Sequence, residues 1–436
     1  MKVTSSYGVE ILHLHKPLRQ TLEIYRRAVK WLIPVFDREW GMLSQIPLEK
    51  KRFNEAEHLV HTTKYNQAIY AFDDHFPKMP SYLRRAAISQ ALGDVSSYHT
   101  RHMQWEESGT AKGEPVLGAD THCMPVFYRD NMYREKDGRT FLKLYSGSDW
   151  VWMEVKIRKT DLDYLRKYWN GKKAAAPVLV KRYKKYFLQF AYDENVGLSG
   201  KPAGDQVVCA VDLGVNTDAV CSIMHADGTV AARRFISLPA EKDQLYRILG
   251  RIRKKQRKNG PGAVRGLWEY ARRLNTEIAK AVAGEICAFA CLYQADVIVF
   301  EYLEMKGKIR GKTRQKLHLW KKNGVQEICM HKAHRMGIRV SRVCAKNTSA
   351  YAFDGSGRVS RDEDNHSMCT FPGGKRYHCD LSASYNIGAR YFVRELIKPF
   401  PETERSLLAA KVPGAGRRTL CTYADFLALL RVISPA

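Results

Sequence analysis

The sequence predicts a multidomain α+β protein, and changes in its hydrophobic pattern predict where the parts divide. From residue 19 to about 115 apolar residues recur every three or four positions, which is typical of helices. From about 116 to 200 they recur every second position, which is typical of strands. Beyond residue 200, fully apolar strands and long helical segments follow one another, as in an α/β domain. With 436 residues, the chain can hold two or three domains.

The charge of the chain predicts its kind of partner. Lys and Arg number 72 against 45 Asp and Glu, a net charge of +27. This surplus exceeds what solubility needs and indicates a polyanion, most commonly nucleic acid. The 23 Tyr and 8 Trp offer flat surfaces for stacking bases. A ribosomal protein would be shorter, and a membrane-surface protein would gather its charge on one amphipathic helix.

The location of the protein is predicted from what the sequence lacks. No apolar run reaches the roughly 18–20 residues that span a bilayer. The first residues lack the apolar core and cleavage site of a signal peptide. The ten cysteines are scattered, several within apolar strands or helices, as in reduced intracellular proteins. We therefore expect a cytoplasmic protein.

The amino-terminal half predicts one strand, then helices, then a β-rich region. Pro34 should kink or end the first helix, and Ser81 should cap a later one. The β-rich region fits a small barrel or sandwich, and the Gly/Pro-rich stretch 196–205 predicts a domain boundary. The expected elements are a strand in 3–15, helices from 19 and at 54–75 and 81–103, and strands at 141–145, 150–157, 177–183 and 186–192.

The carboxyl-terminal half begins with a buried strand that ends on Asp212. Two more strands follow as a meander, which is how a ribonuclease-H-like domain begins. A later buried strand ends on Glu301, and Asp380 starts a long helix with one apolar face. The other expected elements are strands at 219–224, 229–236 and 337–343, helices at 240–258, 264–292 and 317–336, an irregular segment at 344–379, and one closing helix in 398–436.

The three carboxylates Asp212, Glu301 and Asp380 are candidate metal ligands. Two strand ends and a helix start can converge at one edge of a sheet, where like charges raise each other's pKa unless a cation is present. Two Mg²⁺ ions, or Mn²⁺ as a substitute, would resolve this repulsion and support phosphodiester hydrolysis. Taken singly, an aspartate such as Asp212 is more often a turn or cap residue than a metal ligand, and Asp380 alone could simply cap its helix. Glu304 is a rival to Glu301 but follows the end of the strand.

Two basic segments are candidates for nucleic-acid contact. Six cations crowd the end of the helix at 240–258, a density that favours a phosphate-tracking element over a merely solvated face. The loop at 307–316 is also basic. The candidate contact residues are Arg251, Arg253, Lys254, Lys255, Arg257 and Lys258 in the helix, and Arg358, Arg361, Lys375 and Arg376 in the irregular segment.

Four motifs carry a resemblance to a known family. They are VVCAVDLGVNT, VIVFEYLEMKGK, KAHRMGIRVSRVCAKNTSAYA and CDLSASYNIGARY, all within about 205–396. This order resembles the RuvC nuclease domain of transposon-encoded TnpB proteins and of miniature type V CRISPR effectors, including the type V-F-like nucleases. The resemblance implies RNA-guided cleavage of double-stranded DNA by one active site in a prokaryotic cell, in the CRISPR case for antiviral defence. It places Asp212, Glu301 and Asp380 in the catalytic, metal-binding roles.

The resemblance also implies a domain plan and partners. The implied domains are a wedge domain at 1–18 and 116–200, a helical recognition domain at 19–115, a RuvC nuclease domain at 201–343 and 380–436, and a target-nucleic-acid-binding insertion at 344–379. The partners would be guide RNA and target double-stranded DNA. The sequence leaves the oligomeric state open, and the resemblance favours a homodimer on one guide RNA.

One departure from the family concerns zinc. The family often carries a four-cysteine zinc ribbon between the second and third carboxylates. Here Cys344, Cys369 and Cys379 are available, with His366 and His378, and no C-x-x-C pair exists. A structural zinc site needs four closely placed ligands, so we expect none.

Two other functional classes compete with a nuclease. A binding-only relative would silence targets without cutting, but it has no reason to crowd three acids on a basic surface. A sugar-kinase or actin-like ATPase also has a first strand ending near D-x-G. That fold needs glycine-rich phosphate loops, which this sequence does not show.

Overall fold

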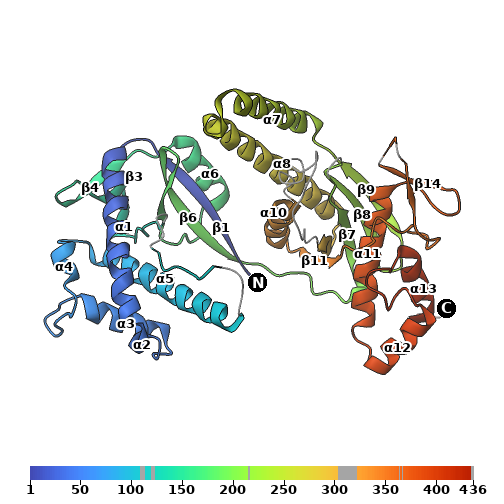
Figure 1. Ribbon diagram of the computed structural model, residues 1–436, viewed down its shortest axis with the longest axis horizontal. Helices are drawn as coiled ribbons and strands as arrows, with labels where there is room; N and C mark the ends of the chain where they lie inside the picture. The colour runs from blue at the N-terminus through green and yellow to red at the C-terminus, as the bar shows by residue number, and fades with distance from the viewer. Residues whose placement is uncertain are drawn as a thin grey trace. The chain divides into compact units, whose positions relative to one another are not determined.

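The computed structural model describes residues 1–108, 113–118, 123–214, 217–302, 322–362, 364–365 and 367–433. The chain forms two compact units (Figure 1). The amino-terminal unit is Lys2–Glu194, and the carboxyl-terminal unit is Met1 with Asn195–Ala436. The division adjoins the Gly/Pro-rich stretch 196–205. Among the described helices, none is long and apolar enough to cross a membrane.

The amino-terminal unit combines helices with two small sheets, whose strand orders are β1-β6-β5 and β2-β3-β4. One hydrophobic core runs through both, joining Leu22 and Phe36 of α1 to Leu142 of β3 and Leu188 of β6. Its elements are β1 (Lys2–Ile11), α1 (His15–Arg38), α2 (Trp40–Leu43), α3 (Glu49–Val60), α4 (Phe72–His75), α5 (Ser81–Ser108), β2 (Tyr133–Lys136), β3 (Arg139–Tyr145), β4 (Trp150–Val155), α6 (Lys159–Trp169), β5 (Val178–Arg182) and β6 (Lys185–Asn195).

The helices of this unit differ from the sequence expectations in three places. Pro34 does not end α1, because the residues on both sides of it, Ile33 and Val35, are buried and hold the helix to the core. The helix expected at 54–75 ends at Val60, where the Asn66 amide donates to the carbonyls of His58 and His61 and closes a turn. Helix α6 was not expected at all.

The carboxyl-terminal unit is built on a five-stranded sheet in the order β11-β10-β7-β8-β9. Strands β7, β8 and β9 form an antiparallel meander, and β10 and β11 run parallel to β7. This is the ribonuclease-H-like arrangement that the sequence predicts. The elements are β7 (Val207–Asp212), β8 (Ala219–His225), β9 (Val230–Ile236), α7 (Pro239–Asn259), α8 (Arg265–Leu292), β10 (Val297–Tyr302), α10 (Lys322–Arg335), β11 (Arg339–Cys344), β12 (Ser360–Arg361), β13 (Met368–Thr370), β14 (Arg376–His378), α11 (Cys379–Ile397), α12 (Glu402–Lys411) and α13 (Tyr423–Ile433).

Helices cover both faces of this sheet, as Figure 1 shows. Strand residues alternate between the two faces. Cys209 and Val211 of β7 pack toward α8 and α10, whereas Val208 and Ala210 pack toward α11 and α13. Helix α11 lies close on the sheet at Gly388, where an added Cβ would stand 3.0 Å from the Met224 methyl group.

Two helical features of this unit lie around the sheet. Helices α7 and α8 form a hairpin with a small core of its own, which includes Ile252 and Ala271. The tail holds two helices instead of the one expected, because Pro413, Gly414 and Gly416 interrupt the helical pattern between them.

Candidate active site

Asp212 and Glu301 lie side by side because of the register of two parallel strands. Val211 of β7 pairs with Phe300 of β10, so the next residue on each strand is a carboxylate. The alternation along β7 and β10 directs both toward the face that α11 covers. Both are buried, with 9% and 7% of their surface exposed.

Asp380 reaches the same edge from the first turn of α11. The loop after β7 lies against it, since a Cβ added to Gly214 would stand 3.6 Å from the Asp380 carboxylate. That Cβ would also stand 2.5 Å from the carbonyl oxygen of Thr217, closer than real contacts allow. Only glycine therefore fits at position 214 without moving the loop.

The pKa of Asp212 shows that the three carboxylates interact electrostatically. Burial raises the pKa of Asp212 well above its usual value, and the charges of Glu301 and Asp380 raise it further. Burial also raises the pKa of Asp380, against the opposing effects of His378 and Arg361. Buried acids that repel one another need a cation to be ionised together.

Glu301 is held from two sides. The buried Thr348 hydroxyl donates to its carboxylate, and the Gln326 amide donates to its backbone carbonyl at 2.9 Å. Asn386 of α11 in turn donates to the carbonyls of Thr348 and Tyr351, at 2.9 and 3.0 Å. Thr348, Gln326 and Asn386 therefore position the acid, although the sequence pattern did not predict them as functional residues. Thr348 lies in the motif KNTSAYA and Asn386 in the motif SYNIGARY.

Arg390 ties the segments around the site to α11. It is buried, and its guanidinium donates to the carbonyls of Cys344 and Lys346 on one side and Thr419 and Cys421 on the other. A buried cation that bonds only to carbonyls serves as a structural clamp. The site therefore rests on a fixed frame.

The donor set suits a hard divalent cation. Carboxylate oxygens are what Mg²⁺ prefers, and it usually takes one or two of them and keeps several waters. Across the described residues, no three His, Cys, Asp or Glu side chains are grouped so as to hold one ion together.

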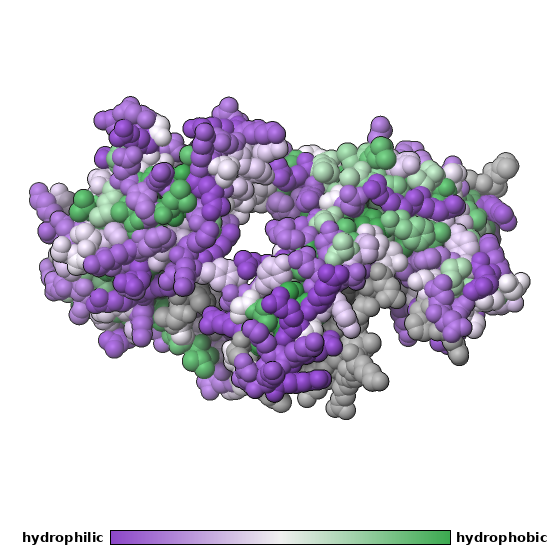
Figure 2. All heavy atoms as spheres, turned by 90° about the horizontal axis from the view of Figure 1, so that it is seen from above, coloured by the Kyte–Doolittle hydropathy of each residue, from purple (hydrophilic) through white to green (hydrophobic). Residues whose placement is uncertain are grey.

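The predicted nucleic-acid-contact residues fall into two groups. The six cations of α7 are all exposed on one helix, and Figure 2, seen from the α7 side, shows a mostly hydrophilic surface. Of the second group, Arg361 is exposed and close enough to the acids to lower the pKa of Asp212 and Asp380. Arg358 is exposed.

Three residues of that group contact other side chains, beginning with Arg361, whose guanidinium donates to the Ser349 hydroxyl at 3.2 Å. Arg376 pairs with Asp362 at 2.5 Å, and the Lys375 ammonium lies 5.0 Å from the centre of the Phe353 ring. The loop at 307–316 and Glu304 lie outside the described residues.

Two cysteines of the segment 344–379 pack in a small core. Cys369 of β13 and Cys379 of α11 are both buried there, beside Phe371. Burial raises the pKa of Cys369 to about 12, and Cys344 ends β11. His366 lies outside the described residues.

Comparison with solved structures identifies the fold. A Cas12f1–sgRNA–target DNA complex matches 79% of this chain over 75% of its own, with a TM-score of 0.50 and 14% identity. The chain has a type V CRISPR effector fold. Two further matches are an AacC2c1–sgRNA binary complex (TM-score 0.43, 9% identity, 87% of this chain and 70% of that one) and a CRISPR–Cas12f ternary complex (TM-score 0.32, 12% identity, 86% and 80%).

Two other comparisons say less. The Aq_aa04 family matches residues 5–146, within the amino-terminal unit. No curated protein matches the sequence.

Proposed function

We propose that the protein is an RNA-guided, Mg²⁺-dependent endonuclease that cuts double-stranded DNA at the edge of the five-stranded sheet. One observation carries the proposal: Asp212 and Glu301 are adjacent in register and face α11, whose first turn contains Asp380. A basic chain has no structural use for three acids grouped so that two of them raise the pKa of the third. Binding divalent ions for phosphodiester cleavage would explain why the three acids are grouped.

Each carboxylate would have a defined part. Asp212, central in the sheet, would hold the metal ions together with Glu301 and Asp380. When bound, such ions supply a water activated for attack and charge stabilisation for the leaving oxygen. Thr348 keeps the Glu301 carboxylate fixed, and Arg361 supplies positive charge near the acids.

Guide RNA and target duplex would be the partners. The Cas12f1 neighbour was solved with an sgRNA and target DNA, and the net charge of +27 suits such ligands. In this mode, base pairing reads sequence while the protein reads backbone shape and a short flanking motif. We place the protein in the prokaryotic cytoplasm, as a homodimer on one guide. A CRISPR effector is favoured over a transposon-encoded TnpB-type nuclease.

The test begins with the RNA that co-purifies with the protein. That RNA should be sequenced, and a supercoiled plasmid complementary to its guide segment should be offered with Mg²⁺. The wild type should nick and linearise the plasmid, and Asp212→Ala should abolish cutting while RNA assembly and DNA binding stay within about twofold. Persistent cutting by Asp212→Ala would refute the site. Binding without cutting by the wild type would identify a binding-only relative.

A further inference from the structure

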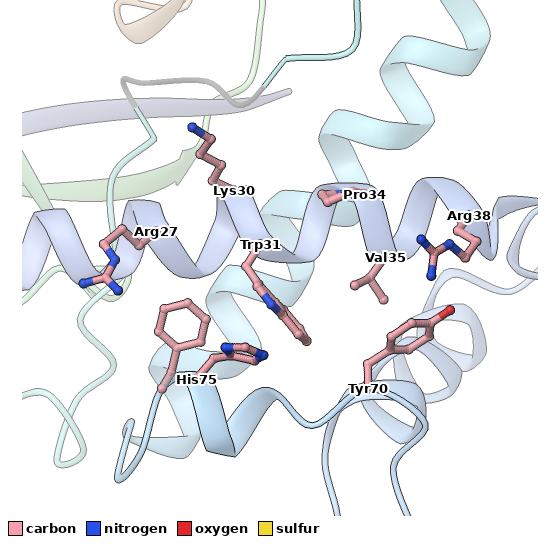
Figure 3. Close-up of a pocket in the computed structure, with 9 residues that line it drawn as sticks. Arg27, Lys30, Trp31, Pro34, Val35, Arg38, Tyr70 and His75 are labelled. Atoms are coloured by element: carbon pink, nitrogen blue, oxygen red, sulfur yellow. The ribbon is translucent and has the colours of Figure 1, made fainter.

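The amino-terminal unit carries a cleft between α1 and the segment 70–76. Its volume is about 610 Å³, within the roughly 300–1,000 Å³ typical of pockets that enclose small ligands. Figure 3 shows Trp31 reaching from α1 toward His75, with Arg27 and Arg38 at opposite ends of the helical wall. No function has been assigned to these residues above.

The wall of the cleft is aromatic and well fixed. The Trp31 ring packs edge-on against Phe72 and Phe76, with centroids 5.7 and 6.3 Å apart. Tyr70 lies opposite α1, and its hydroxyl donates to Glu39 at 2.6 Å. The Trp31 ring also lies 5.1 Å from the His75 ring, and together these contacts hold the flat rings in place at the cleft.

The cations at the two ends are available to a ligand. Arg27 and Arg38 are exposed, and within the described residues neither makes an ion pair or a hydrogen bond. The acids nearest to them in sequence are engaged elsewhere: Glu23 pairs with Arg19 at 3.6 Å, Asp37 bonds His99 at 2.8 Å, and Glu39 accepts from Tyr70. Eleven residues of helix separate the arginines by about 16 Å, which a short nucleotide run can bridge and one phosphate cannot.

We propose that this cleft binds a short unpaired run of the guide RNA, with one base against Trp31 and phosphates of the run on Arg27 and Arg38. The proposal rests on the function proposed above. Proteins bind single-stranded nucleic acid by stacking aromatic rings on the bases and placing cations beside the phosphates. Loops and bulges of RNA splay out single bases for such contacts. The bases of a target duplex, or of a guide–target duplex, are paired and stacked inside the duplex, so they are not available to the cleft.

The test measures binding of a fluorescently labelled uridine heptamer across a series of NaCl concentrations. Trp31→Leu keeps apolar bulk and removes stacking. It should weaken binding by about 5- to 150-fold, the equivalent of the roughly 1–3 kcal/mol per stacked base. Arg27→Ser/Arg38→Ser should instead lower the slope of log affinity against log salt by about 1.4, the value for two phosphates of a single strand.

The matched control is Lys50→Ser/Lys51→Ser, which removes the same charge from exposed positions on α3 of the same unit. It should leave the heptamer affinity within twofold. Thermal melting followed by circular dichroism should match the wild type for every variant included in the comparison. Unchanged affinity in Trp31→Leu, or equal losses in the control, would overturn the proposal.

Two further measurements decide the occupant. Ultraviolet crosslinking of the target-bound ribonucleoprotein should attach a ribonucleotide to a peptide from α1 or segment 70–76. A deoxyribonucleotide there, or no nucleotide, would overturn the assignment. So would cleft variants that change the oligomeric state but not RNA binding, since the cleft would then be a protein interface. Because no cleavage is measured, these failures are distinct from a failure of the wild type to cut plasmid.

Discussion

Neutralising Asp212 should stabilise the metal-free protein. Asp212→Asn keeps the shape of the side chain and removes one of the buried like charges beside Glu301 and Asp380. Relieving a poorly compensated buried polar group changes stability by about 1–3 kcal/mol. For a unit of this size that corresponds to a rise in melting temperature of about 2–12 °C. The assay is thermal unfolding in EDTA.

The pH dependence of this effect has a definite sign. Because folding raises the pKa of Asp212, its destabilising effect is absent below the pKa of the unfolded state, about 3.9. It grows as the pH rises toward the pKa of the folded state. The advantage of Asp212→Asn should therefore be small near pH 4 and large at neutral pH. Added Mg²⁺ should raise the melting temperature of the wild type more than that of the variant.

Asp296 provides the matched control in the same unit. Burial opposes its ionisation, but hydrogen bonds from Val207, Ser199 and Lys201 leave its pKa below the usual value. Asp296→Asn should therefore destabilise the protein, and wild-type Asp296 should lose its contribution as the pH falls. If Asp212→Asn also destabilised the metal-free protein, or its effect did not vary with pH, the reasoning about crowded charges would be wrong.

Three other changes have predictable outcomes. Lys254→Ser/Lys255→Ser on α7 should lower the salt slope of duplex binding by about 2, and an unchanged slope would mean that these residues only face solvent. Arg390→Lys should lower the free energy of unfolding in urea by about 2–4 kcal/mol, because a lysine cannot satisfy the buried carbonyls that the guanidinium bonds; a loss below 1 kcal/mol would contradict the clamp. Gly214→Ala should reduce plasmid cleavage at least tenfold while guide RNA binding stays intact, because its Cβ would collide with the Thr217 carbonyl, and wild-type rates would show that the loop adapts freely.

The sheet and its acids were predictable because strand patterns are local. In each of β7 and β10 a continuous apolar run is followed by an acid, and this pattern predicts Asp212 and Glu301 as candidates at one edge of the sheet. Their adjacency depends on register, which the sequence alone does not give. The structure supplies it through the pairing of Val211 with Phe300.

What the sequence could not predict depends on contacts between distant residues. Thr348 reaches Glu301 across 47 positions, and Arg390 joins segments 44 and 31 positions away. No local pattern marks a polar side chain as a partner for such contacts. The cleft beside Trp31 was missed for a similar reason, since its two walls come from α1 and from segment 70–76, part of which had been expected to be helical.

The central claim is that three carboxylates form one site for cutting DNA. The most direct measurement is the rate of guide-directed plasmid cleavage by Asp212→Asn, Glu301→Gln and Asp380→Asn, each alone, in Mg²⁺. The account predicts that each variant loses at least about a hundredfold in rate, while all three assemble with RNA and bind target DNA as the wild type does. Wild-type cleavage by any one of them would contradict the claim.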